Sequence, residues 1–133
     1  MRNIKFRAYD GDNNAMIYSD DRKNRHKYSF KADLFGLIKP QFAAFIDGDR
    51  YTIQLDNIMQ YTGLCDINEK EIYEGDILQA DNGARFTVEF YDGGFIFTDG
   101  EQVENLTERA ISEVEFFVVG NIYENADLLE GKQ

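Results

Sequence analysis

Two carboxylates, Glu74 and Asp76, have the spacing that acid/base or metal chemistry would use. They stand two positions apart in residues 71–80, which we predict to form one strand, so both side chains would point to the same face. Paired carboxylates on one face can transfer a proton or hold a divalent cation. Acidic residues at the start of a strand more often bond to the amides of a turn. We therefore favour a structural interpretation of this pair.

The other reactive side chains do not form a recognisable catalytic set. No serine lies in a Gly-x-Ser-x-Gly motif, and His26 is the only histidine. Cys65 has apolar neighbours, as a small packing residue does. One histidine and one cysteine are too few for a zinc site, and both glycine-rich phosphate motifs are missing. Residues 10–21 resemble a calcium loop but have Ala15 where that loop requires glycine. We therefore expect no catalytic residue, metal ligand or cofactor.

A cation-rich segment lies in the N-terminal half of the chain. Between Ser19 and Lys31 the hydrophobic pattern stops, and basic residues surround Tyr28 and Phe30. Such a segment can contact nucleic acid or an acidic partner, although a solvated loop is the commoner explanation. Together with the acidic pair it supplies our candidate interaction residues: Arg22, Lys23, Arg25, Lys27, Glu74 and Asp76.

Charge is unevenly distributed along the chain. Residues 1–50 hold ten lysines and arginines against seven acids, a net +3, whereas residues 51–133 hold four against eighteen, a net −14. This asymmetry suggests self-association of unlike surfaces or two distinct partner faces, although excess acid also keeps an aromatic-rich protein soluble. The overall charge of −11 makes direct nucleic-acid binding unfavourable.

The elements that must position these residues are mainly strands. Residues 4–9 alternate apolar and polar side chains, and residues 15–18 can return as the second arm of a hairpin. Residues 34–38 suit one or two helical turns before Pro40, and residues 42–46 form only a short apolar patch. Asp47-Gly48-Asp49 predicts a turn and residues 50–55 a further strand.

The second half predicts a meander of antiparallel strands. Residues 71–80, 84–90 and 95–98 alternate or are apolar, with turns at Asn82-Gly83 and Asp92-Gly93 between them. We place Phe86, Val88 and Phe90 on the core face.

A short helix and a last strand complete the second half. We expect a helical turn at residues 105–111 with Asn105 as its N-cap, a buried strand at 114–119 and a terminal helical turn at 126–130.

These elements predict a mainly β fold. A small, partly open antiparallel barrel of the SH3-like type is the simplest way to close short strands that share an apolar face. We expect one domain over residues 1–133, with an N-terminal hairpin and arm at about 1–50 and a barrel core at about 51–125. The single cysteine and the lack of an apolar run long enough to span a membrane favour a cytoplasmic protein with no membrane partner.

Three blocks of the sequence resemble the YopX family of phage and prophage proteins. They are residues 5–10 with Met16, residues 60–64 with 71–77, and residues 119–125. The residues that we regard as the fold signature are Gln60, Tyr61, Thr62, Gly63, Leu64, Tyr73, Gly75, Gly120, Asn121 and Tyr123. The resemblance implies a mostly β fold, a bacterial host and no settled catalytic residue.

The chain departs from the usual family pattern at several positions. Tyr9 stands where tryptophan is common, Cys65 where lysine is common and Ala126 where proline is common. Glu69 stands where the family has a turn glycine, which argues against a tight turn at Asn68 because glutamate disfavours positive φ.

The function that we predict is that of a non-enzymatic phage accessory protein. It would act by binding a host or phage protein, or by self-association into a homo-oligomer. Three alternatives stay open: an acidic DNA mimic that occupies the basic cleft of a nucleic-acid enzyme, direct nucleic-acid binding through the cation-rich segment, and a weak metal-dependent hydrolase that uses Glu74 and Asp76.

Overall fold

The computed structural model describes residues 5–11, 14–18, 31–33, 41–46, 49–53 and 58–129. The expected helical turn at 34–38 and the candidate residues Arg22, Lys23, Arg25 and Lys27 lie outside these ranges. The chain divides into two compact units, one of residues 4–60 and one made chiefly of residues 61–133. The organisation as one domain stays a proposal.

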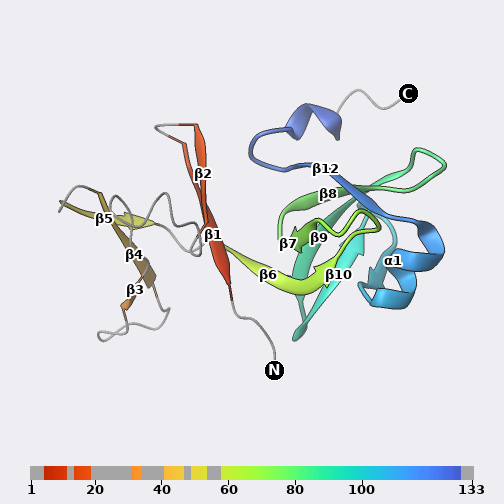
Figure 1. The fold of residues 1–133 in the computed structure, drawn as a ribbon, viewed down its shortest axis with the longest axis horizontal. Helices are drawn as coiled ribbons and strands as arrows, with labels where there is room; N and C mark the ends of the chain where they lie inside the picture. The colour runs from red at the N-terminus through yellow and green to blue at the C-terminus, as the bar shows by residue number, and fades with distance from the viewer. Residues whose placement is uncertain are drawn as a thin grey trace. The chain divides into compact units, whose positions relative to one another are not determined.

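The described residues are mainly strands (Figure 1). In chain order the elements are β1 (Phe6–Asp10), β2 (Ala15–Tyr18), β3 (Lys31–Asp33), β4 (Gln41–Ile46), β5 (Asp49–Ile53), β6 (Ile58–Cys65), β7 (Glu71–Tyr73), β8 (Asp76–Gln79), β9 (Arg85–Tyr91), β10 (Gly94–Thr98), β11 (Val103–Asn105), helix α1 (Glu108–Val114), β12 (Phe117–Asn121) and the 3-10 turn η3 (Ala126–Leu128).

The first unit contains the predicted N-terminal hairpin. β1 and β2 pair antiparallel with Asp10 opposite Ala15, and β1 also pairs with residues 58–60 of β6. The Arg7 guanidinium lies 6.0 Å from the centre of the Tyr18 ring. A second sheet has the order β3-β4-β5, so residues 42–46, which we expected to be only an apolar patch, belong to a strand.

The second unit is built on a five-stranded antiparallel sheet in the order β11-β10-β9-β8-β12. The predicted meander β8-β9-β10 is confirmed. Asp92 and Gly93 both have positive φ, as a two-residue type I′ hairpin turn requires. In the loop before β9, Gly83 has a φ of 92° and the Ala80 amide donates to the Ala84 carbonyl. Both turns that the sequence predicts here are therefore present.

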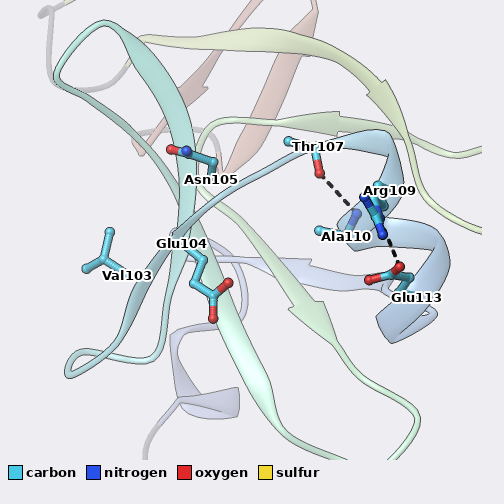
Figure 2. Close-up of a pocket in the computed structure, with 7 residues that line it drawn as sticks. All are labelled: Val103, Glu104, Asn105, Thr107, Arg109, Ala110 and Glu113. Atoms are coloured by element: carbon cyan, nitrogen blue, oxygen red, sulfur yellow. Dashed lines mark hydrogen bonds and ion pairs between the residues drawn. The ribbon is translucent and has the colours of Figure 1, made fainter.

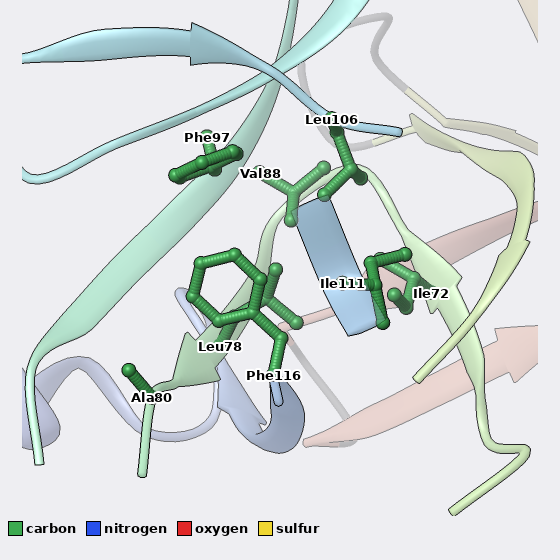
Figure 3. Close-up of a cluster of buried hydrophobic side chains, with 8 residues drawn as sticks. All are labelled: Ile72, Leu78, Ala80, Val88, Phe97, Leu106, Ile111 and Phe116. Atoms are coloured by element: carbon green, nitrogen blue, oxygen red, sulfur yellow. The ribbon is translucent and has the colours of Figure 1, made fainter. Parts of the chain in front are cut away.

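The core of this unit lies among the sheet, β7 and α1 (Figure 3). Phe116, which follows the helix, is fully buried and packs edge-to-face on Phe97 and Phe86. Such aromatic pairs contribute about 0.5–1.5 kcal/mol beyond their burial. The buried cluster consists of Ile72, Leu78, Ala80, Val88, Phe97, Leu106, Ile111 and Phe116.

Four further local predictions, about strands and the helix, were wrong. Residues 71–80 are not one strand, because a turn at Glu74 and Gly75 separates β7 from β8. Phe90 is 51% exposed rather than in the core, since it lies near the end of β9, beyond the buried cluster.

The other two errors concern the ends of the helix. The N-cap of α1 is Thr107, whose hydroxyl accepts from the Ala110 amide, whereas Asn105 ends β11. Val114 ends the helix, so the final strand begins at Phe117 and its first four residues are half-buried rather than buried.

The fold class is confirmed: the protein is mainly β with a small, partly open antiparallel barrel, and the described residues include one short helix and the terminal 3-10 turn at Ala126–Leu128. In the described part of the chain, no helix is long and apolar enough to cross a membrane.

Candidate functional site

The acidic pair of Glu74 and Asp76 is divided by the turn between β7 and β8. Asp76 is 2% exposed, and its Oδ2 accepts a hydrogen bond of 2.7 Å from the Tyr73 amide across that turn. Glu74 is one of the two turn residues and is half-buried. The two carboxylates therefore do not share one face of a strand. Among the residues that the structure describes, no group of three or more potential ligands is placed to hold a metal ion.

The signature residues of β6 and β7 hold these two strands together. The Tyr61 and Tyr73 rings lie with their centres 5.5 Å apart. The buried Thr62 hydroxyl donates to the Ile72 carbonyl at 2.7 Å and accepts from the Leu64 amide. Gly63, with a φ of 87°, lies where the β6–β7 register shifts. Glycine is favoured there because it has no Cβ to oppose positive φ.

Asp66 links the loop after β6 to the last strand. Its side chain is 6% exposed, and Oδ1 accepts from the amides of Asn68 and Lys70 at 2.8 and 2.9 Å. Oδ2 accepts from the Val118 amide at 2.8 Å, so one carboxylate joins segments 52 residues apart.

The last signature block, residues 119–125, is hydrogen-bonded to the turn at Gly75. The Gly75 carbonyl accepts from the Ile122 amide at 2.9 Å, and its own amide donates to Val88. The buried Asn121 Oδ1 accepts from the amides of Tyr123 and Glu124. Hydrogen bonds therefore tie several signature residues, among them Thr62, Gly75 and Asn121, to neighbouring strands and turns, so a role in folding accounts for them.

A groove between β11 and α1 brings exposed charge and apolar surface together. Its outer part has a volume of about 440 Å³ and is lined by Val103, Glu104, Asn105, Thr107, Arg109, Ala110 and Glu113. Figure 2 shows Glu104 on the strand side and Arg109 with Glu113 on the helix side. We call it the β11–α1 groove.

Local folding places the groove residues. Glu104 lies opposite Phe97 in the β10–β11 pairing, so the two side chains share one face of the sheet. Thr107 caps α1, and Ala110 and Glu113, three residues apart, lie on one face of the helix. The Arg109 Nε and Glu113 Oε2 atoms are 3.0 Å apart in an ion pair whose side chains are 85% and 63% exposed.

The inner part of the groove has an aromatic floor. This hollow of about 230 Å³ is lined by Phe86, Gln102, Val114 and Phe116, together with Phe97 and three residues of the outer part, Glu104, Ala110 and Glu113. The three phenylalanine rings contact one another at 4.9–5.5 Å between centres. Glu104 and Glu113 thus hold carboxylates above an apolar surface.

The segment that contains β11 and α1 is strongly acidic, although only Glu104 and Glu113 of its acids line the groove. Residues 99–115 carry six carboxylates against the single cation Arg109, a net −5, and all seven side chains are exposed. The carboxylates belong to Asp99, Glu101, Glu104, Glu108, Glu113 and Glu115. An aromatic floor beneath exposed carboxylates suits a ligand that has both cationic and apolar groups.

Comparison with known proteins gives a family and a fold. The family model described as YopX protein matches residues 5–130. The chain is also similar to the crystal structure of protein EF1440 from Enterococcus faecalis, with 25% sequence identity and a TM-score of 0.63. That similarity covers 98% of this chain and 100% of the other. No curated protein matches the chain.

Proposed function

The chain belongs to the YopX family, and we propose that it is a non-enzymatic accessory protein of a phage or prophage that works by binding a protein segment in the β11–α1 groove. The observation that carries this proposal is the groove itself. Glu104 and Glu113 stand over the floor formed by Phe86, Phe97 and Phe116.

The chemistry of the groove favours a protein ligand. Aromatic side chains supply much of the binding energy at protein interfaces, and charges at the rim set specificity and association rate. The bacterial cytoplasm is the proposed compartment, because an exposed thiol such as that of Cys65 is stable in a reducing environment.

Affinity isolation with matched variants tests the proposal. A tagged wild-type chain is compared in bacterial cells with the groove variant Glu104→Lys/Glu113→Lys and a control, Asp81→Lys/Glu89→Lys. The control has the same change in charge at exposed acids outside the groove. We expect a specific partner that the groove variant loses and the control retains. Equal recovery by both variants, each with an unchanged Tm, would contradict the proposal.

A DNA mimic is a second candidate, because the exposed carboxylates of residues 99–115 form an acidic run. Such a run can compete with DNA for the basic cleft of a nucleic-acid enzyme. This function predicts inhibition of a host nuclease that weakens with salt and is reduced in a Glu101→Gln/Glu104→Gln/Glu108→Gln variant. Absence of inhibition at low salt would remove the DNA-mimic function.

A further inference from the structure

We propose that the β11–α1 groove binds residues 22–31 of a second copy of this chain. The inference rests on the proposed function, because it names the partner of the same groove. Residues 22–31 contain five lysines and arginines and no acid, whereas residues 99–115 carry a net −5. The net charges of the two segments are therefore opposite in sign and equal in magnitude.

The apolar groups of the two segments also match. Residues 22–31 carry Tyr28 and Phe30 among their cations. Of the three phenylalanines that line the inner part of the groove, Phe97 and Phe116 are buried at 7% and 0% exposure, and Phe86 is half-buried and offers the accessible aromatic surface. An aromatic ring can pack on Phe86, and lysine or arginine gains from lying over an aromatic face.

The existing cation of the groove does not block this contact. Arg109 pairs with Glu113, but both side chains are more than half exposed, and exposed ion pairs are weak. A lysine or arginine of the second copy can therefore replace Arg109 at Glu113. Glu104, on the opposite strand side, is a second anchor for a cation.

The size of the groove predicts weak association. A hollow formed by one short strand and one short helix buries less than a standard protein interface. Reciprocal exchange, in which each copy places its segment in the other's groove, doubles the contact and closes a dimer. We expect micromolar association that weakens at least about tenfold between low and high salt, because the contact depends on exposed charges.

Sedimentation velocity of the full chain tests the inference, with two variants that each lack one half of the contact. The groove variant is Glu104→Lys/Glu113→Lys, and the segment variant is Arg22→Glu/Lys23→Glu/Lys27→Glu. We expect the wild type to dimerise at low salt and each variant alone to be monomeric. A mixture of the two variants should form a one-to-one complex at higher concentration than the wild-type dimer needs, because one variant retains the segment, the other retains the groove, and only one of the two contacts can form. The control Asp81→Lys/Glu89→Lys should dimerise like the wild type.

Three results would overturn the inference. They are a wild type that is monomeric at every concentration at low salt, a groove variant that still dimerises, and a mixture of variants that stays monomeric. A monomeric wild type whose affinity-isolated partner is lost only in the groove variant would refute self-association but leave the proposed function standing. A monomeric wild type together with equal partner recovery by the groove variant and the control would refute both the self-association and the proposed function.

Discussion

At the scale of single residues, the Asp66 carboxylate accepts several main-chain hydrogen bonds from different segments. Its carboxylate accepts from the amides of Asn68, Lys70 and Val118 while almost fully buried. The loop at residues 80–84 has the same main-chain bonds but an alanine at the equivalent position. Such a loop can therefore close without the carboxylate, and the contribution specific to Asp66 is the bond to β12.

We predict that Asp66→Ala lowers the free energy of unfolding by about 2–4 kcal/mol, because it removes the buried acceptor of three main-chain hydrogen bonds, one of which joins the loop to β12. Chemical denaturation measures this loss. The control Asp81→Ala changes an exposed carboxylate and should cost less than about 0.5 kcal/mol. A loss for Asp66→Ala as small as that of the control would show that water replaces the carboxylate.

Glu69 has a positive φ, which is unfavourable for glutamate and was not expected from the sequence. We expected glutamate to disfavour a tight turn here, yet Glu69 has a φ of 65° in a three-residue loop closed by the Asp66 amide and the Lys70 carbonyl. Gly83 occupies the same place in the loop at residues 80–84. The left-handed conformation is thus present without the usual glycine, held by the bonds of Asp66.

Glu69→Gly should therefore raise the free energy of unfolding by about 0.5–1 kcal/mol, because it relieves a non-glycine residue at positive φ. The reciprocal change Gly83→Ala should lower it by about 1 kcal/mol. Thermal and chemical denaturation measure both changes. If Glu69→Gly is destabilising, the side chain of Glu69 makes a contact that outweighs the strain.

At the scale of elements, the turn after β12 depends on a close approach. A Cβ added to Gly120 would lie 2.5 Å from Asn125 Oδ1, the atom that accepts from the Asn121 amide. Gly120 is thus required for packing, since its φ is not positive.

We predict that Gly120→Ala costs about 1–3 kcal/mol of unfolding free energy through overpacking. Asn125→Gly removes the opposing side chain and costs about 1 kcal/mol for its hydrogen bond. If the clash is the cause, the double variant should be less destabilised than the sum of the two single variants, as a double-mutant cycle measures. If the losses of unfolding free energy are additive, the clash with Asn125 is not the reason that glycine is needed at position 120.

Local chemistry predicts some elements better than others. The hairpin turn at Asp92-Gly93 and the loop at Gly83 were predictable, because glycine and its neighbour determine the turn type. The break between β7 and β8 was missed because the apolar residues on both sides of Gly75 suggest one continuous strand, whereas Asp76 bonds back to Tyr73 across a turn in which Gly75 has a φ of 89°. The N-cap was misplaced by two residues because Asn105 and Thr107 are both good caps, and pairing of Asn105 with Ile96 decides between them.

The groove was not predicted either, because contacts between distant segments form it. Its acids are visible in the sequence as a charged run, but only the register of β11 places Glu104 on the same face as Phe97. Its floor combines β9, β10 and residue 116, which are distant in the chain. Pairing and packing between distant segments therefore define this candidate site.

At the scale of the whole molecule, the two compact units share strand β6. Residues 58–60 pair with β1, whereas Tyr61 and Cys65 pair with β7. The boundary between the two units therefore falls within β6.

We predict that the chain unfolds in one cooperative transition, in line with the proposed single domain. Far-ultraviolet circular dichroism and tyrosine fluorescence should give the same midpoint in urea. Two separate midpoints would show that residues 4–60 and 61–133 are independent domains.

The central claim is that the β11–α1 groove binds a protein segment, and site-specific photo-crosslinking tests it most directly. A photoreactive phenylalanine analogue replaces Gln102, which lines the groove, or Ser112, which is exposed on α1 outside the groove lining. We predict a discrete covalent adduct in bacterial cells from position 102 that is lost when Glu104→Lys/Glu113→Lys is added, and none from position 112. Equal adducts from both positions, or none from position 102, would contradict the claim.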